Sequence, residues 1–124
     1  MPSRKEHIDK ARHDEQFFSS FDINTTDFLD WVVSGIFYSA LHYVDSYLSI
    51  KREHPLTHGE RTQLIYAAKT ELGRSFFRDY RSLKDDSEEG RYNMRVFTTE
   101  EIRLDIMPLL NNIKVHLRRF IPEI

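Results

Sequence analysis

The 124-residue sequence predicts a single all-α domain, an antiparallel four-helix bundle, from its composition, its apolar periodicity and its helix caps. Hydrophobic residues make up 40% of the chain, which is too many for a disordered protein, and only four glycines and four prolines argue against a turn-rich β-sandwich. Apolar residues recur at helical spacing along four segments, so each segment has one face to bury. Two of these segments begin with the Thr-x-x-Glu pattern of a helix cap.

The first two helices are predicted over residues 4–21 and 27–49, on either side of a polar break at 22–26. The apolar stripe of the first helix is narrow and consists of Ile8, Ala11, Phe18 and Phe21. The second helix has a much broader apolar face, built on Leu29, Val33, Ile36, Ala40, Val44 and Tyr47. A face that broad contacts neighbours on two or more sides, so this helix is predicted to be the central one.

A third helix is predicted from His58 to about Leu83, because Pro55 interrupts the chain and Thr57 then supplies a cap. The polar run 84–90 that follows is predicted to be a loop.

A fourth helix is predicted to open at the Thr98 cap, and its apolar stripe is Ile102, Ile106, Leu109, Ile113, Leu117 and Phe120. Pro108 lies inside this stripe and predicts either a kink or a separate short helix. No linker divides the chain, so residues 1–124 are expected to form one domain.

The composition excludes several classes of function. The absence of cysteine excludes disulfides, thiolate catalysis and zinc ribbons. No apolar run approaches the roughly 20 residues of a membrane span, and the polar N-terminus lacks a signal-peptide core, so a cytoplasmic protein without membrane contact is expected. The sequence lacks the motifs of P-loop ATPases, dinucleotide-dependent dehydrogenases and α/β-hydrolases. The six histidines show no metal-ligand spacing, and we expect neither a metal site nor a cofactor.

A net charge of −2 means that any contact with nucleic acid must come from a local basic patch. Arg74, Arg78 and Arg81 recur at i, i+4 and i+7 and would place three guanidinium groups on one helix face, where they could bind RNA or nucleotide phosphates. Arg91 and Arg95 would extend this patch. The alternative is a solvated face neutralised by the nearby acids Asp79, Asp85, Asp86, Glu88 and Glu89.

His42 lies on the polar edge of the second helix, three residues before Asp45. A carboxylate at that spacing could fix the tautomer of a functional histidine, although a hydrogen-bonded structural histidine is the alternative. Phenylalanines, including Phe17 and Phe18, occur at core spacing and are expected to pack inside. Trp31 could belong to the core or to a subunit contact.

The order of several short motifs resembles the HEPN superfamily (higher eukaryotes and prokaryotes nucleotide-binding domain) over residues 4–118. The motifs are Phe37-Tyr38-Ser39-Ala40-Leu41-His42 in the second helix, His58 at the start of the third, and Arg91-Tyr92 after it. The resemblance implies a helical bundle that pairs with a second copy of itself. It also implies a metal-independent ribonuclease of a toxin–antitoxin or defence system, with an antitoxin or another protein as partner.

Nuclease members of that superfamily carry an arginine, four to six residues, and then a histidine, and Arg52-x5-His58 matches this pattern. The resemblance therefore implies His58 as general acid/base, with Arg52 or Arg61 holding the scissile phosphate. Arg61 could share an anion with His58 at i+3 or could instead pair with Glu60 or a neighbouring acid.

Two other readings stay open. In the first, the chain is a non-catalytic dimeric module that binds nucleotide, RNA or a partner protein through His42, Arg61, Arg74, Arg78, Arg81, Arg91 and Tyr92. In the second, it is an oligomerisation domain whose interface is the apolar second helix.

Overall fold

The computed structural model describes all 124 residues and is all-helical, which confirms the predicted class. Its elements are α1 (Arg4–Ser19), α2 (Leu29–Ile50), α3 (His58–Ala67), α4 (Lys69–Leu72), α5 (Arg74–Tyr92), α6 (Thr99–Glu101), the π-helical turn η1 (Ile102–Ile106) and α7 (Met107–Leu117). None of these helices combines the length and the apolarity that crossing a membrane requires.

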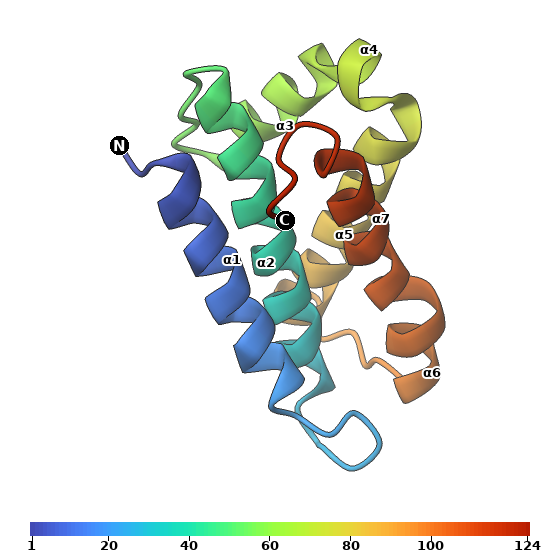
Figure 1. The fold of residues 1–124 in the computed structure, drawn as a ribbon. Coiled ribbons are helices and arrows are strands. Elements are labelled where there is room, and N and C mark those ends of the chain that lie inside the picture. The colour runs from blue at the N-terminus through green and yellow to red at the C-terminus, as the bar shows by residue number, and fades with distance from the viewer.

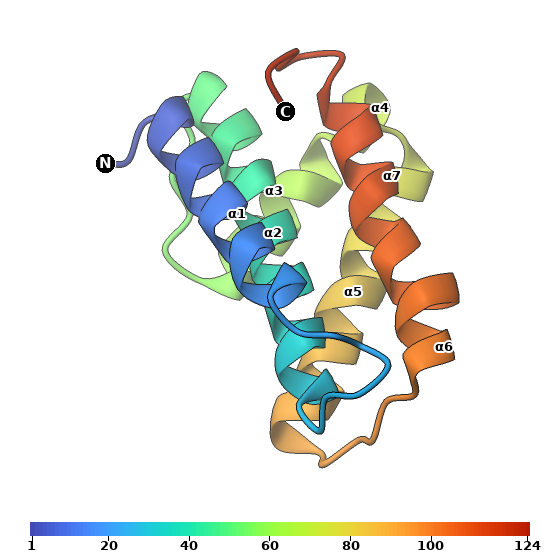
Figure 2. The same cartoon turned by 60° about the horizontal axis from the view of Figure 1, so that its bottom comes forward.

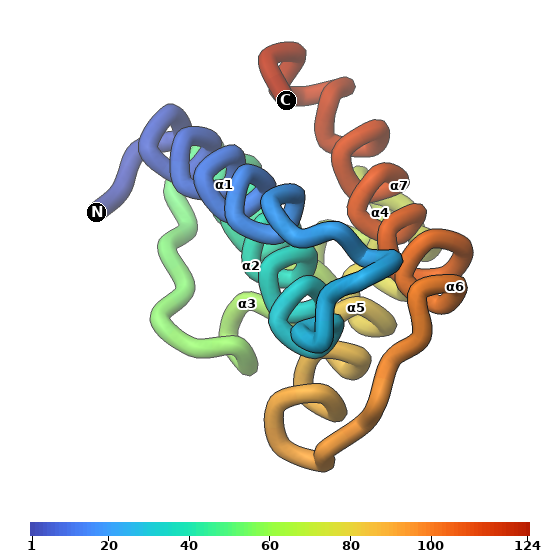
Figure 3. The backbone as a smooth tube through the Cα atoms, turned by 90° about the horizontal axis from the view of Figure 1, so that it is seen from below, coloured from blue at the N-terminus to red at the C-terminus, as the bar shows by residue number.

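Helix α2 is the centre of the structure and packs against α1, α5 and α7. In Figure 1, α1 and α2 lie side by side and run in opposite directions, with α5 and α7 on the other side of α2. Figure 2 shows the C-terminal tail turning back from the end of α7. The view from below in Figure 3 shows the α1–α2 connection and the segment leading to α6 at the same end of the molecule, where the Thr99 hydroxyl donates a hydrogen bond to the Ile23 carbonyl at 2.6 Å.

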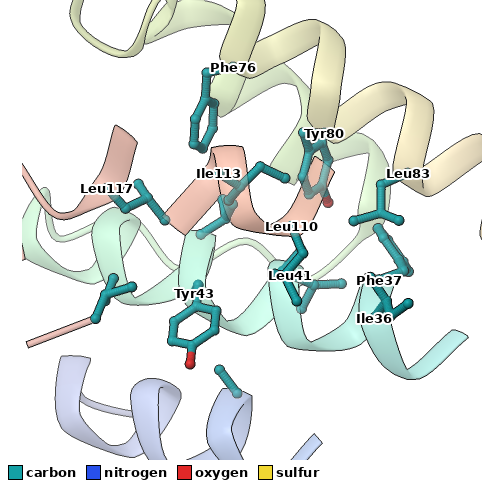
Figure 4. Close-up of a cluster of buried hydrophobic side chains, with 14 of the residues drawn as sticks. Ile36, Phe37, Leu41, Tyr43, Phe76, Tyr80, Leu83, Leu110, Ile113 and Leu117 are labelled. Atoms are coloured by element: carbon teal, nitrogen blue, oxygen red, sulfur yellow. The ribbon is translucent and has the colours of Figure 1, made fainter. Parts of the chain in front are cut away.

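The hydrophobic core includes residues of every long helix, and Figure 4 shows the part of it between α2, α5 and α7. Phe76, Tyr80 and Leu83 of α5 are completely buried there, opposite side chains of α7 that include Ile113 and Leu117. The broad apolar face of α2 closes the third side of this core, so the prediction that this helix is central is confirmed.

Helices α1 and α2 approach each other closely at Gly35. A Cβ atom at this position would lie 2.9 Å from Cβ of Phe18 and 3.2 Å from Cδ2 of Phe17. One turn further along α2, the buried Ser39 hydroxyl donates to the Ala11 carbonyl at 3.0 Å. The missing side chain at Gly35 is therefore what lets the two helices pack at this distance.

The third predicted helix is not continuous. Gly73 adopts a φ of 94°, a value that favours glycine, and the chain turns there between α4 and α5. The predicted helix from His58 to Leu83 is therefore divided into α3, α4 and α5.

The predicted loop at 84–90 is wrong, because α5 continues through it to Tyr92. Leu83 and Ser87 are both completely buried, four residues apart on the face that α5 turns to the core. The charged residues around them lie at the sides of this face or on the outer face, and Lys84 pairs with Glu88 at 2.6 Å. The polar run is thus the solvated side of an amphipathic helix.

The predicted helix starts at His58 and Thr98 are confirmed. The Thr57 hydroxyl accepts from the Glu60 N–H at 3.0 Å, and Thr98 and Glu101 form a complete capping box. Pro108 lies in the first turn of α7, and η1 directly precedes it without a break in the helical backbone. The predicted disturbance around Pro108 is therefore present, as a widened π turn.

Candidate functional site

A cavity of about 470 Å³ lies between α1, α2 and the end of α5. This volume is in the range of pockets that hold small molecules. Helix α1 contributes Lys10, His13, Asp14 and Phe17, α2 contributes Trp31, Ser34, Gly35, Tyr38 and His42, and α5 contributes Arg91. The lining thus combines aromatic rings, cationic groups and hydrogen-bonding side chains.

Two large aromatic side chains of the cavity are exposed. Trp31 is 55% exposed and Phe17 is 43% exposed, whereas the adjacent Phe18 is buried in the core. The prediction that Phe17 packs inside is wrong: one edge of its ring lies against Gly35 of α2, but the rest of the ring stays exposed. Exposed rings on a cavity wall provide flat surfaces on which a planar ligand can stack.

Arg91 is held on the cavity wall without an acidic partner. Its guanidinium lies 5.1 Å from the Tyr38 ring centroid and 5.8 Å from that of Phe37, and Nη1 donates a hydrogen bond to the Tyr38 hydroxyl. No carboxylate lies within ion-pair distance of Arg91, and its buried Nε has no hydrogen-bond partner. The exposed Tyr92 ring contacts the same guanidinium at 5.2 Å. The positive charge of Arg91 is therefore fixed in place and not neutralised.

His58 begins α3 and is exposed, with its ring 6.0 Å from that of Phe37. Its Nδ1 lies 3.5 Å from Nη1 of Arg61. Partial burial lowers the pKa of His58, and the positive charges of Arg61, Lys84 and Arg91 lower it further. The imidazole is therefore neutral near pH 7, beside several cations.

Arg61 is buried and pairs with Asp45 rather than with Glu60. Its Nε donates to Oδ1 of Asp45 at 2.7 Å and its Nη2 to Oδ2 at 3.0 Å, which is a bidentate ion pair between α3 and α2. Both side chains are more than nine-tenths buried. This pair fixes α3 against α2 and thereby sets the position of His58.

Arg52 and His58 are not joined by a hydrogen bond. Arg52 lies in the turn after α2, where it is exposed, has a φ of 58° and makes no side-chain hydrogen bond or ion pair.

Arg74, Arg78 and Arg81 lie on the exposed face of α5, as their spacing predicts, and none of them has an ion-pair partner. This face is solvated, and none of the nearby acids forms an ion pair with these three arginines. Two nearby acids, Asp86 and Glu89, pair instead with Arg95, which consequently does not extend the free basic patch.

The structure brings together one group that sequence reasoning missed. His7 of α1 stacks on His42 of α2 with ring centroids 5.9 Å apart, and Oδ2 of Asp14 lies 3.9 Å from Nε2 of His42. His7, His42 and Asp45 each place a potential ligand atom within 4.8 Å of the other two. The i, i+3 spacing of His42 and Asp45 was the available signal, whereas His7 joins them only through the packing of α1 on α2.

Among known proteins, no family model matches the chain, and neither a curated protein nor a solved structure matches it.

Proposed function

We propose that this chain is a HEPN-like domain that binds nucleotides or RNA in the cavity between α1, α2 and α5. The observation that carries this proposal is Arg91, a guanidinium without a carboxylate partner on the wall of a cavity that also exposes aromatic rings. A guanidinium matches the geometry of two phosphate oxygens. The exposed rings of Trp31 and Phe17 offer stacking surfaces for a base.

Other residues of the cavity suit the rest of a nucleotide. Lys10 supplies a second cation near the phosphate, partly balanced by Asp14 at 3.5 Å. Ser34 offers a hydrogen bond to a ribose hydroxyl. The unpaired Arg74, Arg78 and Arg81 would contact further phosphates of a longer RNA, so a strand of several nucleotides should bind more tightly than a mononucleotide.

The architecture proposed with this function is an antiparallel four-helix bundle of the HEPN type. The four longest helices, α1, α2, α5 and α7, support it by their lengths and mutual packing. From the resemblance we further propose that the domain pairs with a second copy of itself and serves in a toxin–antitoxin or defence system.

The sole tryptophan of the chain provides a direct test, because Trp31 lies on the cavity wall. Titration with adenosine monophosphate and with a short single-stranded RNA should quench its fluorescence in a saturable way. Arg91→Gln should weaken binding by about tenfold or more, the loss expected for a charge-assisted hydrogen bond. Arg78→Gln, an equal change of charge on α5 outside the cavity, should weaken mononucleotide binding less than about twofold, since exposed charges act weakly at a distance. No quenching by either ligand at millimolar concentration would refute the proposal.

A second candidate function is metal-independent RNA cleavage at His58. The observation that favours it is a neutral, exposed imidazole whose Nδ1 lies 3.5 Å from Nη1 of Arg61, with the positive charge of Arg91 nearby. In this reaction His58 takes the proton of a ribose 2′-hydroxyl, and the oxygen attacks the adjacent phosphorus. The bond to the 5′-oxygen then breaks, the leaving oxygen takes a proton from water, and a cyclic 2′,3′-phosphate remains.

The cleavage test uses a mixed RNA pool in the presence of a chelator and compares the wild type with His58→Ala. His116→Ala, a histidine change on α7, is the control. Cleavage that disappears only in His58→Ala supports the nuclease. If the folded wild type binds nucleotides but does not cleave RNA, the nuclease function is rejected and the binding function remains supported.

A further inference from the structure

Two histidines and one aspartate form a cluster between α1 and α2 that the nucleotide proposal does not explain. The potential ligand atoms of His7, His42 and Asp45 all lie within 4.8 Å of one another. His7 and His42 are half-buried, and Asp45 is buried. Ligands of a tetrahedral zinc ion lie about 3.3 Å apart, given metal–ligand distances of about 2.0–2.1 Å. Small rotamer changes would therefore close this cluster around one ion.

The two nitrogens of His42 have different surroundings. Nε2 lies 3.9 Å from Oδ2 of Asp14, whereas the buried Nδ1 has no hydrogen-bond partner. A buried nitrogen without a partner costs free energy, and a metal ion would remove that cost. A carboxylate facing the other nitrogen is the usual way in which a protein orients a metal-binding histidine. The surroundings thus assign Nδ1 to the metal and Nε2 to Asp14.

We propose that His7, His42 and Asp45 bind one divalent transition-metal ion, with zinc as the natural occupant. Imidazole and carboxylate ligands suit zinc, and three protein ligands leave a fourth position for water or substrate. His7 and Asp45 also line a small cavity of about 130 Å³, which has room for such a water.

The Arg61 pair is compatible with this assignment. Arg61 uses one hydrogen bond on each oxygen of the Asp45 carboxylate, at 2.7 and 3.0 Å. An ionised carboxylate has about four lone-pair positions, so one remains on each oxygen for a metal. Hydrogen bonds to a ligating carboxylate are common in metal sites and hold the ligand in place.

The test uses the full chain without an affinity tag, stripped of metal by a chelator and dialysed. Isothermal titration with zinc chloride should give one site per chain. Titration with cobalt chloride should give the visible absorption bands of a tetrahedral ion. His7→Gln and His42→Gln should each weaken zinc binding more than tenfold, because even loss of a residue that only supports a ligand costs about 10–100-fold. His116→Gln on α7 is the matched control and should retain wild-type affinity.

A thermal melt with and without zinc separates loss of the site from loss of the fold. Zinc should raise the melting temperature of the wild type and of His116→Gln, since a ligand that binds only the folded state stabilises it. It should leave the melting temperature of folded His7→Gln and His42→Gln unchanged. Absence of zinc binding by the wild type at micromolar concentration would overturn the proposal. So would zinc binding that both substitutions leave intact.

Discussion

Neutralising Asp45 should destabilise the protein more than any other isosteric change of a carboxylate in the chain. Arg61 is only 8% exposed and Asp45 only 6%, so Asp45→Asn leaves a guanidinium charge buried without its counter-charge. The ion pair comprises hydrogen bonds of 2.7 and 3.0 Å. Each is worth about 1.5–3 kcal/mol, and breaking a buried pair by changing one partner costs about 3–5 kcal/mol.

We therefore expect Asp45→Asn to lower the free energy of unfolding by about 3–5 kcal/mol, a large share of the roughly 5–15 kcal/mol of a typical domain. Urea denaturation followed by circular dichroism, in chelator, measures this loss. The same experiment on Asp9→Asn provides the control. Asp9 pairs with Lys5 at 2.8 Å, but both side chains are more than half exposed. Its loss should not exceed about 1 kcal/mol.

A double substitution tests whether the unpaired buried charge causes the loss of stability. Asp45→Leu with Arg61→Met replaces the pair by apolar side chains and should restore most of the stability, because no buried charge remains. Equal losses for Asp45→Asn and Asp9→Asn would refute the reasoning, since burial is the main difference between the two pairs.

Three further predictions concern packing, backbone conformation and pH. Gly35→Ala should destabilise the protein by about 1–3 kcal/mol in urea denaturation, because the new Cβ would lie 2.9 Å from Cβ of Phe18. The control Gly59→Ala, which has only the Thr57 hydroxyl nearby at 3.9 Å, should be neutral or stabilising by up to about 1 kcal/mol. Equal effects of the two substitutions would contradict the close contact at Gly35. Gly73→Ala should cost about 1–3 kcal/mol through its φ of 94° alone, because no atom would contact the new methyl, and an unchanged melting temperature would argue against that conformation. The pKa of His58 is lowered, so the unfolded chain binds more protons between that pKa and about 6.5, and stability should fall as pH drops through this window. His58→Gln should flatten this dependence in urea denaturation at about pH 7.5 and pH 5, and an unchanged slope would contradict the shift.

Helix starts could be predicted from the sequence because their determinants are local. The caps at Thr57 and Thr98 depend on hydrogen bonds within three residues, which the sequence contains. The continuation of α5 through residues 84–90 could not be predicted, because Ser87 is buried only in the folded structure and its sequence neighbours are polar. Composition alone makes a polar run look like a loop.

In the candidate site too, residues in local motifs could be predicted, whereas residues that come together only by helix packing could not. His42 and Arg91 could be singled out from motifs, and both line the cavity. His7 could not, because it reaches His42 only through the close packing of α1 on α2 at Gly35. The exposure of Phe17 likewise depends on which of two adjacent rings the neighbouring helix covers, and spacing within one helix does not determine that.

The Asp45–Arg61 pair connects the proposed metal site with the candidate cleavage site, because its carboxylate lies in the histidine cluster of α1 and α2 and its guanidinium lies beside His58. A cation bound to the Asp45 carboxylate would weaken the Asp45–Arg61 ion pair, so more of the positive charge of Arg61 would face His58. The two positions would then be thermodynamically linked with positive cooperativity, and such linkage is reciprocal. If zinc tightens the binding of a phosphate at His58 by some factor, the phosphate must tighten the binding of zinc by the same factor.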